Sequence, residues 1–423
     1  MRIGSVLSLA LKSAFNRKAT ALLTILAVAV SVMLYVGVER VRQGAQESFE
    51  RTVSGADLVV GARSGPINLI LYSIFHIGDP TNNVTWETYQ DIAQRPEIAW
   101  IIPLSLGDSH QGFRVVGTEL SFFEHYRFGD DARVEIDKGE LFADVFDAVL
   151  GADVAQALQY KVGDHIVLSH GVGSVSFTDH ADKPFVVSGI LKRTGTPVDR
   201  AVHVSLEAIT AIHIGWESGA KTALARVATA DRVRQMDLTP HDITAMIIGL
   251  KSRPSVLRLQ RDISSYAEEP LLAVIPGVAL SQLWDVIGIV ERLLSAISAC
   301  VVAVGLVVIL VTILTSLNER RREMAILRSV GASPADIFLL LVMEAAALAF
   351  LGALTGLALL YGALVLLAPL ILSTTGVPLS SVRPDMFDVA VVAAVVASAA
   401  ALALIPAWRA FRNSLADGLS IRI

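Results

Sequence analysis

Histidine and aspartate side chains gather in one hydrophilic stretch of the chain and could bind a metal there. The histidines are His165, His170 and His180, and the acids beside them are Asp164, Asp179 and Asp182. Imidazole and carboxylate are ligand types that zinc accepts. Their spacing is irregular, however, whereas tight zinc sites show regular spacing and supporting partners. We therefore assign no metal site here and keep the three histidines as weak candidates.

Glu344 places a carboxylate inside a long apolar run, where an unpaired charge is costly. As a functional group it would be a proton or substrate ligand. As a structural group it would pair with a basic residue at a neighbouring span end, such as Arg17, Lys18 or Arg409. The apolar runs contain no second charge that could extend a proton relay. The structural role is therefore favoured, and ion conduction is poorly supported.

The sequence contains no recognisable set of catalytic residues. It has no Gly-x-x-x-x-Gly-Lys-Ser/Thr phosphate loop, no His-Glu-x-x-His and no Gly-x-Ser-x-Gly. Cys300 is the one cysteine and lies in an apolar run, which excludes an internal disulfide and a cysteine-built metal site. We therefore expect a protein that is not an enzyme, binds no cofactor itself and takes its energy from a partner.

A charged segment after residue 318 has the pattern of a short helix with one apolar stripe. Met324, Leu327 and Val330, with Ile326 beside them, form the stripe, and the other faces carry charged residues. The residues expected to contact a partner are Arg320, Arg321, Glu323, Met324, Leu327, Arg328, Val330 and Gly331. A basic loop bound to anionic lipid is the alternative, but the apolar stripe favours docking into a groove.

Local signals define where this segment ends. Gly331 can end the helix in a left-handed cap. Ser333, Pro334 and Asp336 then form a restart signal, with a serine cap, a proline at the first helical position and an acid at the third. A short helix held between two rigid spans has the shape to fill a groove on a partner protein.

The chain is too apolar for an ordinary soluble protein. Its 423 residues are 53% hydrophobic and 18% charged, with a mean hydropathy of +0.58, whereas soluble domains carry about 25% charged residues. Four windows reach the roughly 20 apolar residues of a membrane helix: 19–38, 293–317, 337 to about 372, and 389–408. The third is longer than a span requires, so we expect it to leave the membrane or break near Pro369. The net charge of −5 gives no reason to expect a nucleic-acid partner.

Basic flanks predict the orientation of these spans. Lysine and arginine gather in the N-terminal flank, in the link after the second span and in the C-terminal tail, at Arg2, Lys12, Arg17, Lys18, Arg320, Arg321, Arg322, Arg328, Arg409, Arg412 and Arg422. The positive-inside rule puts all three segments in the cytoplasm. The long segment between the first two spans then lies outside, because long domains translocate largely regardless of their charge.

These features predict a membrane protein with four transmembrane α-helices and a large α+β extracytoplasmic domain inserted between helices 1 and 2. The expected parts are a cytoplasmic amphipathic segment (1–18), the first span (19–38), the outer domain with its stalk (39–285), the second span (293–317), the link (318–335), the third span (336–370), an outer loop (371–388), the fourth span (389–408) and a cytoplasmic tail (409–423).

Mixed patterns within the outer segment predict its α+β character. Helices are expected at 86–94, with Thr85 as cap, at 147–158 and at 206–214, and strands at 113–116, 165–168, 185–190 and 201–204. Residues 66–77 form an apolar stretch bounded by glycines, which we expect to be a core strand. A protruding apolar lip is the alternative for that stretch.

Gly352 and Gly356 in the third window have the small-xxx-small spacing that lets membrane helices approach closely. We expect them to pack either against a second copy of the chain or against another span of the same chain.

The segments described above resemble the MacB/FtsX-like permeases of ABC transporters, a group that includes macrolide-exporter, lipoprotein-release and cell-division members. The link, Glu319-Arg-Arg-Arg-Glu-Met-Ala-Ile-Leu-Arg-Ser-Val-Gly-Ala-Ser333, is similar to the family's cytoplasmic segment. Val149-Leu-Gly-Ala-Asp-Val-Ala-Gln-Ala-Leu-Gln-Tyr-Lys-Val-Gly-Asp164 and residues 185–204 resemble its outer-domain signature and closing strands. Ile405-Pro-Ala-Trp-Arg-Ala410 resembles the ending of its last span.

The resemblance implies a permease subunit of the bacterial inner membrane that transmits motion to its periplasmic domain. It implies two copies of a separate ABC ATPase, which would bind ATP and Mg²⁺, and a second permease copy, identical or related. The link would be the coupling helix. A periplasmic adaptor or lipoprotein is a further possible partner. The substrate would be a lipoprotein, peptide or amphipathic molecule; the alternatives are a non-transporting regulator of a periplasmic enzyme and a component of a metal-handling system.

Overall fold

The structure, a computed structural model, describes residues 18–52, 55–171, 182–215, 229–319, 324, 326, 328–375 and 384–412. The chain divides into two compact units. The first comprises Met1–Gly44, Gly288–Leu370 and Leu379–Ile423, and the second comprises Ala45–Ile287 and Ile371–Pro378. The helices α2 (Lys18–Thr52) and α10 (Pro276–Glu319) contribute residues to both units.

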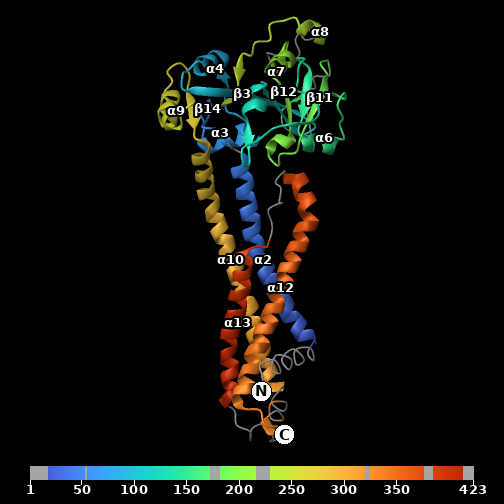
Figure 1. The fold of residues 1–423 in the computed structure, drawn as a ribbon, viewed down its shortest axis with the longest axis vertical. Helices are drawn as coiled ribbons and strands as arrows, with labels where there is room; N and C mark the ends of the chain where they lie inside the picture. Colours follow the sequence, from blue (N-terminus) through green and yellow to red (C-terminus); the bar gives the residue numbers. More distant parts are fainter. Residues whose placement is uncertain are drawn as a thin grey trace. The chain divides into compact units, whose positions relative to one another are not determined.

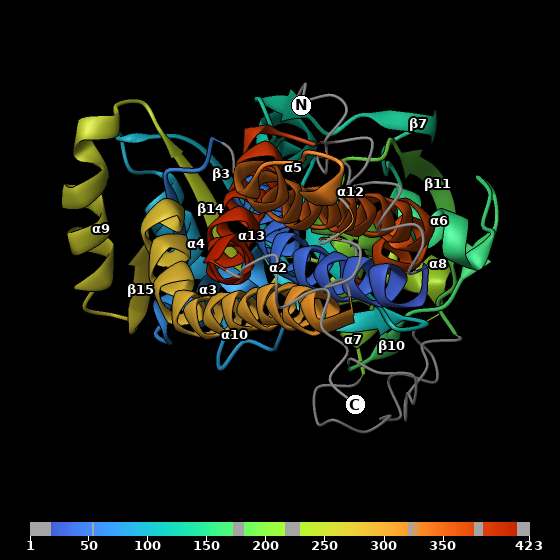
Figure 2. The same ribbon diagram turned by 90° about the horizontal axis from the view of Figure 1, so that it is seen from below.

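The first unit is a bundle in which α2 and α10 pack with α12 (Pro334–Thr375) and α13 (Met386–Arg412). Each helix contains a segment long and apolar enough to cross a membrane, namely Lys18–Gly44, Pro276–Thr315, Pro334–Ala368 and Met386–Phe411. The shortest has 26 residues, and a helix of that length is about 39 Å long, which exceeds the roughly 30 Å of a hydrocarbon core. The prediction of four membrane helices is therefore confirmed. Seen end-on, α2 lies between α10 and α12 (Figure 2).

The third helix does not end at Pro369. The sequence predicts that this span leaves the membrane or breaks there, but α12 continues to Thr375, so a break is wrong. The segment apolar enough to cross a membrane ends at Ala368. A proline removes one backbone donor, and a long helix can continue past it when the remaining bonds are kept.

The second unit is built on one mixed sheet. Among the described residues, eleven strands belong to it, with the order β15-β1-β14-β3-β4-β12-β8-β11-β7, while β10 pairs with β3 and β9 with β11. Their bounds are β1 Leu58–Ala62, β3 Ile98–His110, β4 Phe113–Thr118, β7 Ile136–Gly139, β8 Asp147–Leu150, β9 His165–Ile166, β10 Ser169–His170, β11 Phe185–Leu191, β12 Ala201–Ser205, β14 Ala245–Leu250 and β15 Leu271–Val274. Two small sheets pair β2 (Val84–Thr85) with β13 (Asp242–Ile243) and β5 (Arg127–Phe128) with β6 (Ala132–Arg133).

Short helices cover this sheet. They are α3 Pro66–Ser73, α4 Trp86–Ala93, α5 Ser121–His125, α6 Ala152–Leu158, α7 Leu206–His213, α8 Ala230–Val233 and α9 Val256–Ser264, with 3-10 turns η1 at Pro197–Arg200 and η3 at Arg253–Ser255. Figure 1 shows α4 and α9 on the side of β14, and α6 and α7 on the side of β11 and β12. Separate apolar cores lie beneath these two groups of helices.

The strand β3 joins the two halves of the sheet. It pairs antiparallel with β14 from Ile98 to Leu104, and with β4 over the rest of its length. A register shift between Leu106 and Ser109 interrupts the second pairing. Beyond β4 the sheet includes parallel pairs, because β12 runs parallel to β4 and β11 runs parallel to β8.

Several local predictions for the outer domain are confirmed. Thr85 caps α4 by accepting a hydrogen bond from the Thr88 amide. The predicted helix at 206–214 is α7, and the strands expected at 113–116, 185–190 and 201–204 are β4, β11 and β12. The strand expected at 165–168 is present only as the two residues of β9.

The prediction of one helix over 147–158 is wrong in its first part. Asp147–Leu150 is the strand β8, which pairs with β11 and β12, and only Ala152–Leu158 is helical. Gly151 separates the two elements, and a Cβ there would overlap the carbonyl oxygens of Val198 and Asp199. Val149 and Leu150 fit a helical period, but burial between neighbouring strands decides their conformation.

The first part of the stretch 66–77 is the helix α3, Pro66–Ser73, rather than the expected core strand. Pro66 opens α3, where its missing amide donor costs nothing. Leu69, Ile70 and Tyr72 are buried against the sheet. Tertiary packing can bury an apolar run in either conformation, so the pattern alone could not distinguish them.

We expect Gly151 to be essential for the stability of the outer domain. In a soluble fragment from about Arg42 to Leu280, Gly151→Ala should cost about 3 kcal/mol, the upper end for overpacking, because backbone oxygens cannot move aside. That cost lowers the melting temperature of a domain of this size by about 6–12 °C. Gly65→Ala is the matched control, since its new Cβ would find its nearest neighbour at 3.9 Å. Equal melting of the two variants would contradict the packing described for Gly151.

Candidate functional site

The link between α10 and α12 has the local structure that its sequence predicts. Gly331 has a φ of +103°, the left-handed conformation expected at the end of a helix. The helix α12 begins with a reciprocal cap: the Asp336 amide donates to Ser333 Oγ at 3.2 Å, and the Ser333 amide donates to Asp336 Oδ2 at 2.9 Å. These caps fix the direction in which the chain leaves the link.

The apolar side chains of the link differ in exposure. Met324 packs against the apolar core of the bundle, whereas Ile326 is 54% exposed and Val330 is 83% exposed. Arg328 lies within 3.5 Å of the Phe411 carbonyl oxygen near the end of α13. Arg320, Arg321, Glu323 and Leu327 lie outside the described residues. The described part of the link is therefore anchored on one side and open on another.

The glycines predicted to allow close packing lie against α2 of the same chain. A Cβ on Gly352 would lie 2.7 Å from the Cβ of Val28, and one on Gly356 would lie 2.5 Å from the carbonyl oxygen of Ala29. Only a residue without a side chain allows these backbones to approach so closely. The structure thus shows the intrachain arrangement of the two that the spacing allows.

A second face of α2 contacts α10 through small polar groups. Ser31 donates to the Val301 carbonyl at 3.1 Å, and the hydroxyls of Thr24 and Thr312 lie 3.1 Å apart. Gly305 of α10 leaves the space that the Ser31 side chain fills. Hydrogen bonds of this kind hold membrane helices together where water is absent.

A charged network joins α2 to the start of α13. Arg40 donates to both carboxylate oxygens of Asp385, at 2.5 and 3.0 Å, and to Asp388 Oδ1 at 2.7 Å. Tyr361 of α12 donates to the other oxygen of Asp388. Arg40 is 5% exposed and Asp388 is 2% exposed, so charge pairing is needed to offset their desolvation. The guanidinium lowers the pKa of Asp385, which lies outside the apolar segments, to about 2.

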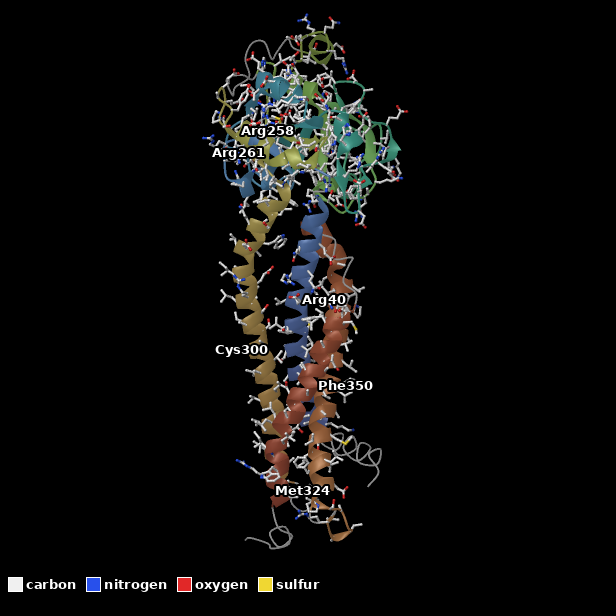
Figure 3. All side chains as sticks on the ribbon, turned by 60° about the vertical axis from the view of Figure 1, so that its left-hand side comes forward. Arg40, Arg258, Arg261, Cys300, Met324 and Phe350 are labelled. Atoms are coloured by element: carbon white, nitrogen blue, oxygen red, sulfur yellow. The ribbon has the colours of Figure 1, made fainter. Side chains whose placement is uncertain are left out.

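The same acids also cap α13. Asp385 Oδ1 accepts the Phe387 amide at 2.8 Å, and the Asp385 amide donates to Asp388 Oδ2 at 3.2 Å. The sequence analysis did not find this network, because Arg40 and the two acids lie just beyond the predicted spans. The available signal for the cap was the pair of acids Asp385 and Asp388, which lie three residues apart immediately before an apolar run. Figure 3 labels Arg40 on α2 and Met324 toward the other end of the bundle.

Glu344 is buried within α12, with an exposed fraction of 7%. It lies in the bundle, where an unpaired carboxylate would be costly. Its pairing with Arg17, Lys18 or Arg409 stays a prediction, because Arg17 lies outside the described residues.

The three candidate histidines of the outer domain have different surroundings. His170 lies beside Asp108 and His213. His165 is exposed on β9, away from that group, and His180 lies outside the described residues. The sequence analysis did not select Asp108 and His213, which lie far from His170 in the chain.

The bundle therefore has an anchored network at one end and a partly exposed apolar link at the other. The helices that connect these two ends are continuous, and the close contacts of Gly352 and Gly356 with α2 hold α2 and α12 in register. Such an arrangement suits transmission of a displacement.

Comparisons with known families cover both units. The family model described as MacB-like periplasmic core domain matches residues 21–245. The model described as FtsX-like permease C-terminal matches residues 295–415, which include the link, α12 and α13. A search of curated proteins finds no match.

Two solved structures are similar to the chain at low identity. The crystal structure of the periplasmic region of MacB from Actinobacillus actinomycetemcomitans is 10% identical, with a TM-score of 0.33, over 54% of this chain and 94% of that one. The extracellular domain of the noncanonic ABC-type transporter YknZ from Gram-positive bacteria is 10% identical, with a TM-score of 0.29, over 51% of this chain and 98% of that one. Scores this low carry no argument of their own.

We expect the Arg40 network to be a main source of bundle stability. Arg40→Ala leaves Asp388 buried without its cation, which should cost about 3–5 kcal/mol. Arg42→Ala, two residues along α2, is the matched control. Its salt bridge to Glu39 is partly exposed and should contribute about 0–1 kcal/mol. Thermal unfolding of the detergent-solubilised full chain measures both, and similar losses in the two variants would contradict the role of Arg40.

Proposed function

Because the chain belongs to the MacB/FtsX-like family of ABC transporter permeases, we propose that it couples ATP hydrolysis by a separate ATPase subunit to movement of its outer domain. The chain is a membrane protein with a large extracytoplasmic domain between its first two membrane helices. We propose further that ATP hydrolysis supplies the energy for this movement and that the link is the part of the chain that receives it.

One observation carries this proposal: the described part of the link presents exposed apolar side chains from a rigidly held position. Ile326 and Val330 are exposed, while Met324 packs on the bundle and the Ser333–Asp336 cap fixes the start of α12. Exposed apolar residues on a fixed segment favour docking into a partner's groove. A segment that only contacts lipid headgroups would not need this fixed geometry.

We propose an assembly of two permease copies with two ATPase subunits in the bacterial inner membrane. The ATPase subunits would bind ATP and Mg²⁺, and closure of the pair would displace the two links. The close contacts of α2 with α12, and its charged contacts with α13, support movement of the bundle as a rigid body. The second permease copy would be identical or related.

The substrate would be handled on the outer side of the membrane. Export or extraction of a lipoprotein, a peptide or another amphipathic molecule fits a permease of this family. Co-purification of the full chain from its own membranes in mild detergent, followed by mass spectrometry, tests this step. Recovery of a lipoprotein or adaptor would support transport, and recovery of a periplasmic hydrolase would contradict it.

We expect Val330→Asp to uncouple the permease from its ATPase. A charge in the docking face would be buried without a partner, so stimulation of ATP turnover in the reconstituted complex should fall at least tenfold. Leu327→Asp should act in the same way, and Arg328→Ala should have a milder effect if the residue lies at the rim of the contact. The mutant permeases should still insert and keep the elution volume of the unmutated permease.

Val162→Asp is the matched control for this experiment. Val162 is an exposed valine of the outer domain, so the same substitution there should leave ATP turnover unchanged. Full coupled activity in the Val330→Asp variant would show that the link contacts lipid instead of the ATPase.

We expect the link and the outer domain to lie on opposite sides of the membrane. In a Cys300→Ser background, cysteines replacing Ser329 and Asn82, both exposed, should differ in labelling by an impermeant reagent. Intact cells with a permeabilised outer membrane should label position 82 only, and lysed cells both. Labelling of position 329 in intact cells would reverse the orientation.

A further inference from the structure

Three metal-binding side chains from three separate elements meet in the outer domain. Asp108 lies on β3 next to its register shift, His170 lies directly opposite it on β10, and His213 is the last residue of α7. Figure 2 shows β10 and α7 side by side. The imidazole rings of His170 and His213 stack with their centroids 4.6 Å apart. The elements are far apart in sequence, so the fold creates the cluster.

The distances between the ligand atoms match one face of a tetrahedron around a metal ion. His170 Nδ1 lies 3.0 Å from Asp108 Oδ1, His213 Nε2 lies 3.7 Å from the same oxygen, and the two nitrogens are 3.3 Å apart. Zinc bonds to nitrogen and oxygen are about 2.0–2.1 Å long, which places tetrahedral ligand atoms about 3.3–3.4 Å from one another. The three measured separations lie around this value.

The carboxylate oxygen that faces this cluster is buried. Asp108 is 2% exposed, and its Oδ1 lies between the two imidazoles, closer to His170 than to His213. A carboxylate oxygen and two imidazole nitrogens gathered in one place are a set of donor atoms that a transition metal accepts.

Other contacts hold the histidines in place. The pairing of β10 with β3 holds His170 opposite Asp108. Lys183 is fully buried and donates to the Ala211 carbonyl at 2.7 Å, so it fixes the end of α7.

We propose that Asp108, His170 and His213 form a binding site for a divalent transition metal of the zinc class. Imidazole nitrogens favour such ions over Mg²⁺ and Ca²⁺, which take oxygen ligands. The His170 and His213 side chains are 35% and 37% exposed. The fourth tetrahedral position would be filled by water or by another ligand.

Metal binding by the full-length protein in detergent tests this proposal. After chelator treatment, Zn²⁺ is titrated in competition with a chromophoric chelator. One tight site per chain is expected, and the double variant His170→Gln/His213→Gln should bind at least 100-fold more weakly. His165→Gln, which removes an exposed histidine of the same domain, should leave the affinity unchanged. Equal binding by the double variant, or no tight site in the unmutated protein, would overturn the proposal.

A gain of signal identifies the ligand directly. In a Cys300→Ser background, His213→Cys should add a near-ultraviolet thiolate-to-metal absorption when Co²⁺ is bound, and His165→Cys should not. Zn²⁺ should also raise the melting temperature of the unmutated protein and not that of the double variant. If the double variant fails to fold, the cobalt spectrum still decides, because absence of the new band in a folded His213→Cys protein refutes the assignment.

Discussion

The arrangement of the membrane bundle depends on the burial of one guanidinium. Arg40 cannot leave water without anionic partners, since an unpaired charge in this environment is prohibitively costly. Asp385 and Asp388 at the start of α13 supply the charges, and Tyr361 of α12 completes the coordination of Asp388. A displacement of α2 along α13 would break ionic contacts, and a displacement of α12 would break the hydrogen bond of Tyr361 to Asp388. The pairing therefore fixes the axial register of α2, α12 and α13.

Small residues complete this arrangement where charge is absent. Gly352 and Gly356 bring α12 against the backbone of α2, and Gly305 makes room for Ser31 on a second face of α2. In lipid, apolar side chains gain little by leaving one apolar environment for another, so close packing and internal hydrogen bonds must hold the helices together. Strong contacts on several faces of α2 make it the element around which the bundle is organised.

The sequence predicted features that arise from local chemistry. Four apolar windows, the cap at Ser333 and the left-handed Gly331 depend on residues close together in the chain, and the structure contains all of them. The predictions failed where distant packing decides. Residues 147–150 fit a helical pattern, yet two neighbouring strands make them a strand, and residues 66–77 show the reverse. A periodic pattern of apolar residues indicates that one face of a segment is buried, but it does not show which other element packs against that face.

The same limit explains why polar clusters could not be predicted from spacing. Asp108 and His213 lie on elements far apart in the outer domain's sequence, and the register of β3 with β10 is what sets Asp108 beside His170. Asp385 and Arg40 come from the two ends of the chain. In each cluster some groups lie at an element's end or irregular point, as Asp108, His213 and Asp385 do, while Arg40 and Tyr361 lie inside long helices. Local sequence can place each of these residues on its own element, but only the packing of distant elements brings the polar groups together. The fold must therefore be known before the neighbours of such groups are.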